Sequence, residues 1–249
     1  MGITRVQFAP ISLAAAGAVA ATALGIAAVD VDRSWLPGLG WLAALAYLVT
    51  STVLLLTGLN RRHAQQFGAA NGVTALRSAL VGLITGLVVD SFVEPMPSSV
   101  LVALVVPALL LDAVDGWVAR RCVAATEVGA RFDMEVDAFL LLALSVYVSR
   151  ELGAWVLAIG LMRYAFVAAG WLLPWLRGQL PPRYWRKVVT AVQGIALTFA
   201  ATGWLRVLAV VLVAFALALL VESFGRDVIW LAVRRNVSGS ELPAARKPR

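Results

Sequence analysis

The sequence predicts an all-α protein, a polytopic bundle of membrane-spanning helices. Of its 249 residues 61% are hydrophobic and only 14% are charged, and the mean hydropathy is +0.86. This composition excludes an ordinary soluble domain. The apolar runs are also too long and continuous for the strands of a membrane barrel. We therefore expect helices, which satisfy their own backbone hydrogen bonds inside lipid.

Eight apolar segments have the length and composition of membrane spans. They are expected at 11–29, 41–59, 73–91, 100–118, 132–148, 152–176, 188–202 and 207–221. The first segment, preceded by Arg5, could also be a signal peptide, but its length, its acidic flank and the spans that follow favour a span. After the last span, residues 222–235 are amphipathic and are expected to lie in the membrane interface.

The basic residues predict the orientation of these spans. Only Arg33, Arg150 and Arg206 fall in expected outer loops, Arg163 lies within a span, and the other basic residues fall inside. By the positive-inside rule both termini are cytoplasmic, and we expect an integral protein of a bacterial cell (inner) membrane. The net charge of +7 is then explained by loops that face anionic lipid, and no nucleic-acid partner is expected.

Four aspartates interrupt this apolar sequence within one short stretch. Asp112 and Asp115 are spaced i,i+3, and Asp133 and Asp137 are spaced i,i+4, so each pair lies on one face of a helix. The direction of the two spans puts all four at one depth, near the cytoplasmic surface. Clustered carboxylates so close to lipid need a compensating cation. The sequence therefore predicts a site for a hard divalent cation, Mg²⁺ or alternatively Mn²⁺.

Gly116, Ala119, Arg120 and Gly129 lie between the two aspartate pairs, so the stretch reads D-x-x-D-G-x-x-A-R and then G-x-x-x-D-x-x-x-D. This pattern resembles the signature of the CDP-alcohol phosphotransferase (CDP-alcohol phosphatidyltransferase) family, with every motif position filled. The family resemblance implies a Mg²⁺-dependent enzyme that transfers a substituted phosphate from a CDP-linked alcohol to an acceptor hydroxyl and releases CMP. It also implies a homodimer with its active site open to the cytoplasm.

A second motif precedes the first, with Asn71, Thr74 and Arg77 in the pattern N-x-x-T-x-x-R. Asn71 is suited to cap the helix that starts here, and a helix start also suits an anion. The motif resembles the segment at the head of the first core helix in the same family. The resemblance therefore covers 71 to about 221, a six-helix core preceded by two N-terminal transmembrane helices. We expect an N-terminal extension and linker at 1–70, the core at 71–235 and a disordered basic tail at 236–249.

The resemblance also implies roles for individual residues. The metal ligands would be Asp112, Asp115, Asp133 and Asp137, with Asp137 also serving as the general base. The contacts to the CDP-alcohol would come from Asn71, Thr74, Arg77, Gly116, Arg120 and Thr126.

The acceptor is indicated by two partial matches to bacterial phosphatidylglycerophosphate synthases and their cardiolipin-synthase relatives. In residues 186–193, Thr190 and Gln193 fit their K-x-K-T-x-x-Q segment, although a valine replaces the second lysine. Residues 162–164 resemble their Arg-Glu pair, with tyrosine replacing glutamate. The basic residues near these matches are either an acceptor site or an ordinary cytoplasmic loop: Arg163, Arg183, Arg186 and Lys187.

A basic acceptor site suits a phosphorylated polyol, so glycerol 3-phosphate is the first choice of acceptor and CDP-diacylglycerol the expected donor. Within the family the alternatives are inositol phosphate, serine, phosphatidylglycerol or a soluble CDP-alcohol. Outside it, UbiA-type prenyltransferases also use two aspartate-rich motifs with Mg²⁺, but they lack the contiguous D-G-x-x-A-R. A cation transporter with acidic ligands is a further alternative, and it would form no product.

Overall fold

The computed structural model describes residues 38–61, 69–121, 127–178, 180–181 and 184–240. The expected span at 11–29, most of the linker before Ala70 and the end of the tail lie outside these residues, as do Thr126 and Arg183.

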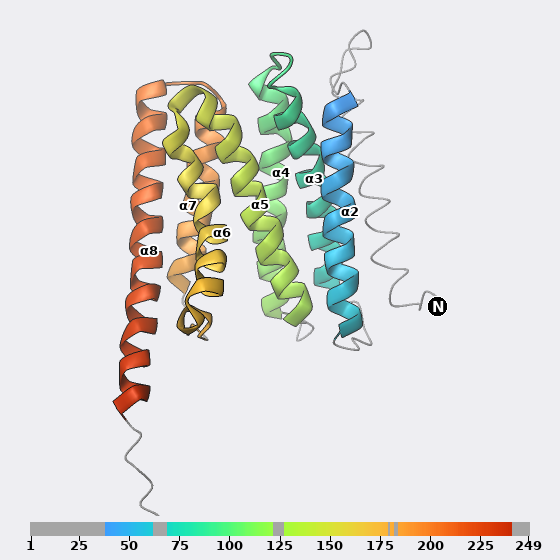
Figure 1. The fold of residues 1–249 in the computed structure, drawn as a ribbon. Coiled ribbons are helices and arrows are strands. Elements are labelled where there is room, and N and C mark those ends of the chain that lie inside the picture. The colour runs from blue at the N-terminus through green and yellow to red at the C-terminus, as the bar shows by residue number, and fades with distance from the viewer. Residues whose placement is uncertain (1–37, 62–68, 122–126, 179, 182–183, 241–249) are drawn as a thin grey trace, which may run out of the picture.

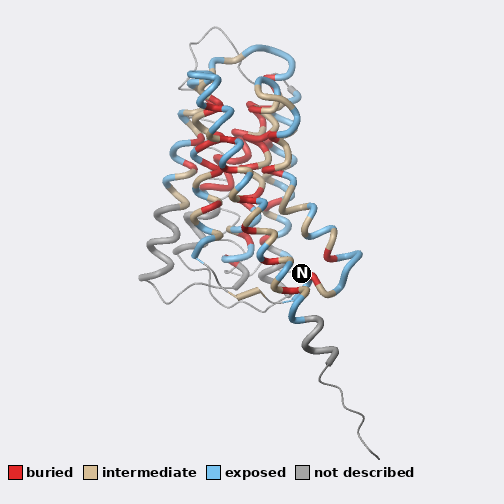
Figure 2. The backbone as a smooth tube through the Cα atoms, turned by 90° about the vertical axis from the view of Figure 1, so that its left-hand side faces the viewer, coloured by how far each residue is buried: buried red, intermediate tan, exposed pale blue. Residues whose placement is uncertain are grey.

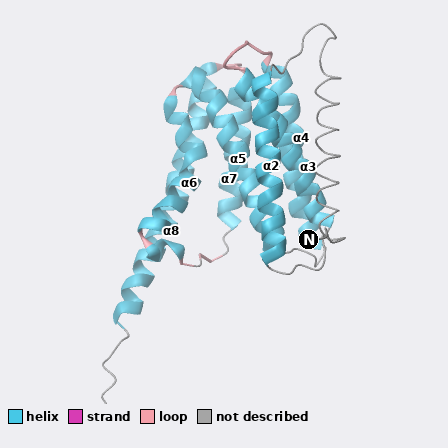
Figure 3. Ribbon diagram, turned by 45° about the vertical axis from the view of Figure 1, so that its right-hand side comes forward, coloured by secondary structure: helices cyan, strands magenta, loops and turns pink. Residues whose placement is uncertain are grey.

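The described residues form seven α-helices and contain no strand (Figure 3). The helices run up and down beside one another, with α2 and α8 at opposite sides of the bundle (Figure 1). Their bounds are α2 Gly38–Arg61, α3 Ala69–Asp90, α4 Ser98–Arg121, α5 Glu127–Leu152, α6 Leu157–Leu172, α7 Tyr184–Ala201 and α8 Arg206–Ser240. Two short 3₁₀ helices, η1 Ala154–Val156 and η2 Pro174–Arg177, flank α6. The all-helical prediction is confirmed for this part of the chain.

The single span expected at 152–176 is not one continuous α-helix, because a glycine and a proline interrupt it near its two ends. Gly153 has a φ of 103°, a left-handed conformation that glycine adopts without strain, and it separates α5 from η1. At the other end Pro174 disfavours helical geometry at Leu173, whose ψ is 89°, and α6 therefore stops at Leu172.

Two helix ends near the aspartates also differ from expectation. The inner loop expected at 120–131 is shorter, because α4 continues to Arg121 and α5 already begins at Glu127. Asn71 was expected to cap its helix, but α3 begins at Ala69, so Asn71 lies within the first turn. Longer helices on both sides bring the two aspartate motifs onto regular secondary structure.

Helix α8 continues without interruption where an interfacial segment and then a disordered tail were expected. It runs as one helix to Ser240, so residues 222–240 extend the last span and project beyond the bundle (Figure 1). Side-chain contacts support this extension: Arg226 pairs with Glu222 one turn earlier, and the Arg234 guanidinium lies 4.4 Å from the centre of the Trp230 ring.

Among the residues that the structure describes, two helical segments are long and apolar enough to cross a membrane, at 154–172 and 206–234. Shorter apolar helical stretches occur at Leu39–Leu55 and Ser98–Asp112. Large apolar side chains also cover much of the outer surface, including Leu172 and Val207, which are more than three-quarters exposed. An apolar exterior of this kind fits lipid and not water. These features indicate a membrane protein, and the count of eight spans stays a prediction.

The buried residues line the inner faces of the helices (Figure 2). Fully buried Ile84, Leu101, Leu144 and Leu197 come from α3, α4, α5 and α7, so the core joins these four helices. In lipid the packing itself has to hold helices together, and small residues allow close approach. Gly160 of α6 is such a residue, because a Cβ there would lie 2.5 Å from the Cα of Leu142 in α5.

Gly160→Ala should destabilise the bundle by about 1–3 kcal/mol, because the added methyl group forces α6 away from the α5 backbone. The measurement is the thermal unfolding midpoint in detergent or nanodiscs. The matched control is Gly225→Ala, where a Cβ would meet no atom within 4 Å and stability should be unchanged or slightly raised. Equal midpoints for the two variants would contradict the close α5–α6 contact.

Candidate metal and nucleotide site

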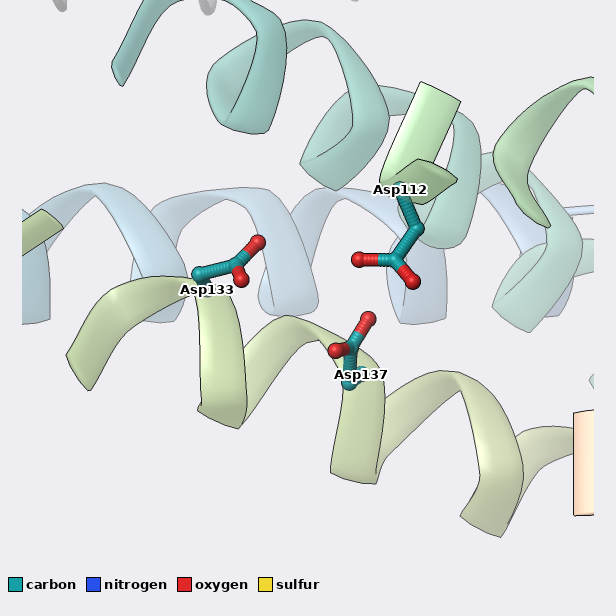
Figure 4. Close-up of side chains that lie close together, drawn as sticks. All are labelled: Asp112, Asp133 and Asp137. Carbon is teal, nitrogen blue, oxygen red and sulfur yellow. The ribbon is translucent and has the colours of Figure 1, made fainter. Parts of the chain in front are cut away.

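Three of the four predicted aspartates converge at one end of the bundle. Asp112 lies near the end of α4, and Asp133 and Asp137 lie one turn apart near the start of α5. Their carboxylates point toward one another (Figure 4), and one oxygen from each lies within 4.8 Å of the others. The helix spacing and opposite span directions that predicted this meeting are both present.

Arg77 of α3 lies among these carboxylates and binds all three. Its Nη1 donates to Oδ1 of Asp112 over 2.6 Å. Its Nη2 pairs with Oδ1 of Asp133, contacts the Asp133 backbone carbonyl at 3.3 Å and lies 2.9 Å from Oδ1 of Asp137. Because α3 packs on both α4 and α5, the planar guanidinium can bridge the two aspartate-bearing helices.

Arg77 and the aspartates differ sharply in burial. The Arg77 side chain is 1% exposed, whereas those of Asp112, Asp133 and Asp137 are 44%, 32% and 24% exposed. The guanidinium therefore backs the cluster from inside the bundle, and the carboxylates open on their other side. A nucleotide on that open side would meet the carboxylates before Arg77. The observed partners of Arg77 are carboxylates, and its contact to the CDP-alcohol stays a prediction.

The donor set fits a divalent cation. Three carboxylates around one guanidinium leave a formal charge of −2, and carboxylate oxygens are the ligands that Mg²⁺ and Mn²⁺ prefer. A cation on the open side would be held by Asp112, Asp133 and Asp137 and would balance this charge. The family pattern adds Asp115, which lies on α4 one turn after Asp112.

The remaining predicted nucleotide contacts are placed only by their helices. Gly116 and Arg120 lie on the last turns of α4, and Asn71 and Thr74 lie on the first turns of α3. The start of α3, the end of α4 and the start of α5 lie at the same end of the bundle (Figure 1). Their roles, that of Asp115 and that of Thr126, which lies outside the described residues, stay predictions.

Two of the four basic residues expected to bind the acceptor, Arg163 and Arg186, have acidic partners. Arg163 of α6 pairs through Nη2 with Glu135 of α5, and both side chains are partly exposed, at 33% and 49%. The pair joins α6 to α5, and Glu135 lies between Asp133 and Asp137 in the sequence.

Arg186 of α7 is held by a different acid, the buried Asp227 of α8. Its Nε lies 2.9 Å from one Asp227 oxygen, its Nη2 donates to the other over 3.2 Å, and Nη2 also donates to the Pro181 carbonyl over 2.9 Å. This arrangement ties α7 to α8. Lys187, the next residue, is exposed.

Sequence reasoning did not identify Glu135 and Asp227 as the partners of these arginines. A signal was present for Glu135. An arginine within a span requires a polar neighbour, and Glu135, between Asp133 and Asp137, was an acid without an assigned role. No comparable signal existed for Asp227, which is far from Arg186 in the chain.

A helical membrane protein with this cluster belongs to a recognisable class of membrane enzyme. The family model for CDP-alcohol phosphatidyltransferases matches residues 67–222, more than half of the chain. The chain therefore belongs to the CDP-alcohol phosphatidyltransferase family, whose members transfer a phosphatidyl-type group from a CDP-alcohol and use divalent metals. Membership favours this chemistry over a UbiA-type prenyltransferase or a cation transporter. Comparisons with curated proteins and with solved structures give no match.

Arg77→Gln should lower the stability of the metal-free protein by about 3 kcal/mol or more, because it removes the buried cation from among three carboxylates. The measurement is the thermal unfolding midpoint in EDTA, repeated with Mn²⁺. Added Mn²⁺ should raise the midpoint of the variant more than that of the wild type, since the ion can balance the exposed charge.

The control for this substitution is Arg150→Gln, at the opposite end of α5. Arg150 binds the Ser91 hydroxyl and carbonyl and lies over the Phe92 ring. Its loss should not alter the response to Mn²⁺. A metal response that is the same in both variants would contradict a counterion role for Arg77.

Proposed function

We propose that this chain is a Mg²⁺-dependent phospholipid synthase. It transfers the phosphatidyl group of CDP-diacylglycerol to a hydroxyl of a phosphorylated polyol, with glycerol 3-phosphate as the first choice, and releases CMP. The observation that carries the proposal is the convergence of Asp112, Asp133 and Asp137 within the family domain. The family membership supplies the CDP-alcohol, and the three carboxylates are exposed enough for a ligand to reach them.

The residues divide the reaction among themselves. The acceptor oxygen forms a bond to the phosphorus that carries the diacylglycerol, the bond from that phosphorus to CMP breaks, and the acceptor proton passes to Asp137. A bound divalent cation would neutralise the charge that develops on the pyrophosphate. Asp112, Asp115, Asp133 and Asp137 would hold it, while Gly116 allows close approach of the nucleotide and Arg120 can fork onto a phosphate.

A lipid donor is supported by the surroundings of the site. The bundle is apolar outside, and the cluster lies toward the end where most of the basic residues that the structure describes are found. A lipid can therefore keep its acyl chains beside the helices while its diphosphate reaches the carboxylates. A soluble acceptor would enter from the cytoplasm at the same end. We propose that the protein spans the bacterial inner membrane eight times. We also propose that it forms a homodimer, and the mass of the detergent-solubilised protein would test this oligomeric state.

A phosphorylated acceptor is supported by Arg163 of α6, whose partner Glu135 lies between Asp133 and Asp137 in the sequence. Its pairing with Glu135 is partly exposed, and exposed ion pairs exchange partners at little cost. An acceptor phosphate could therefore take the place of Glu135. Arg186, whose charge is balanced by buried Asp227, supports this role less well. A neutral or zwitterionic acceptor such as serine would leave the Arg163–Glu135 pair intact.

The proposed reaction is tested with purified protein, Mg²⁺ and CDP-diacylglycerol, with acceptors added one at a time and CMP release measured. Release with glycerol 3-phosphate is expected. Asp137→Asn should lower kcat by about 100-fold or more at saturating Mg²⁺, because the acceptor proton loses its base. Glu94→Gln, at the other end of the bundle, is the control and should keep wild-type turnover. Near-normal turnover of the Asp137→Asn variant would overturn the general-base role. CMP release only with another acceptor would show that glycerol 3-phosphate is not the substrate.

Glu135→Gln should lower the KM for glycerol 3-phosphate by up to about fivefold at nearly constant kcat, because it frees Arg163 from an exposed ion pair. Arg163→Gln should raise the same KM by about tenfold or more, since a charge-assisted hydrogen bond to the phosphate is lost. The measurement is steady-state CMP release with the acceptor varied. Unchanged KM values in both variants would exclude Arg163 from acceptor binding.

A further inference from the structure

Helix α2 lies outside the family domain but packs directly on it. The family match begins at residue 67, whereas α2 ends at Arg61. Figures 1 and 3 both place α2 alongside α3, and α2 contacts α5 as well. These are the two helices that carry Arg77, Asp133 and Asp137.

Glycines on both helices allow an unusually close approach. A Cβ on Gly82 of α3 would lie 3.0 Å from Leu48 Cγ and 3.2 Å from Tyr47 Cδ1, both on α2. At the far end of the pair, a Cβ on Gly40 of α2 would collide with the Asp90 carboxylate of α3. Helix α2 therefore packs closely on α3 at two separate places along the pair.

Tyr47 of α2 connects this contact to the site. Its hydroxyl lies 3.5 Å from the Ser78 hydroxyl, which in turn lies 3.3 Å from the Ser51 hydroxyl. Ser78 directly follows Arg77. The Tyr47 ring packs on Phe139 of α5 with ring centres 4.5 Å apart, two residues after Asp137. Tyr47 thus contacts the residue that follows Arg77 on α3 and a residue two positions after Asp137 on α5.

The burial pattern depends on the same helix. Ser51 of α2 and Ser78 of α3 are both buried, and their hydroxyls lie 3.3 Å apart. Helix α2 covers this side of α3, so the polar layer that includes Ser51 and Ser78 lies between two helices.

We propose that Tyr47 is a positioning residue of the aspartate site. Through Tyr47, helix α2 contributes to the geometry of this site and is not only a membrane anchor. Tyr47 holds the Arg77 turn of α3 and the Asp137 turn of α5 at a fixed separation. The three carboxylates are then already gathered when a divalent cation arrives. This inference deepens the proposed function and rests on it only for the identity of the substrates.

The test measures Mn²⁺ affinity by electron paramagnetic resonance in the purified full-length chain, without substrates. Tyr47→Leu, which removes both the hydroxyl and the ring, should weaken Mn²⁺ binding by about tenfold, the usual effect of losing an outer-shell partner. Tyr47→Phe keeps the ring contact with Phe139 and should recover part of this loss. Unfolding midpoints in EDTA identify any variant that fails to fold. If Tyr47→Leu fails to fold, the Mn²⁺ affinity of Tyr47→Phe decides the test.

Thr50→Val is the matched control, because Thr50 is an exposed α2 residue whose hydroxyl bonds only to the Ala46 carbonyl of its own helix, over 2.7 Å. Its Mn²⁺ affinity should equal that of the wild type. Wild-type affinity in both Tyr47 variants, or no Mn²⁺ binding by the wild type, would overturn the inference. Mn²⁺ binding that falls in the Tyr47 variants would support it even if no CDP-alcohol tested releases CMP, which separates it from failure of the proposed function.

Discussion

The contact between one buried arginine and three carboxylates is the interaction on which the arrangement of this protein depends. Arg77 comes from α3, and the acids come from α4 and α5, so the contact determines how three helices meet. A buried arginine without acids, or clustered acids without a cation, would be strongly unfavourable at this depth. Together they form a pre-organised cluster whose excess negative charge faces outward.

This arrangement explains why the site can be both stable and reactive. The carboxylates repel one another, and a site that had to gather them during each turnover would lose binding energy to that repulsion. Arg77 offsets part of the repulsion from behind, where it does not obstruct the open side. A divalent cation can then approach the exposed side of the carboxylates. A pyrophosphate, which is an anion, is favoured there only after the cation has bound. Positioning of this kind is the main contribution a protein makes to phosphate transfer.

The fold class and the meeting of three aspartates could be predicted from the sequence. Both follow from local rules: apolar run length gives the helices, i,i+4 spacing puts Asp133 and Asp137 on one face, and opposite span directions bring Asp112 to the same depth. The partner of Arg77 could not be predicted in this way, since its acids lie 35 and 56 residues further along the chain. Helix packing alone decides such contacts. The same applies to Tyr47 and Phe139, and to the ion pair of Arg186 with Asp227.

Helix α8 has a length that the membrane itself must accommodate. Its 35 residues span about 52 Å, against a hydrocarbon layer of about 30 Å. The surplus has to emerge among the lipid headgroups or beyond them, and it carries the stacked Trp230 and Arg234. Side chains of this type settle at the headgroup level. The headgroup contacts of α8 therefore determine the depth of the bundle in the bilayer. That depth in turn determines how far the carboxylates lie from the lipid headgroup phosphates, where the diphosphate of a lipid substrate would be.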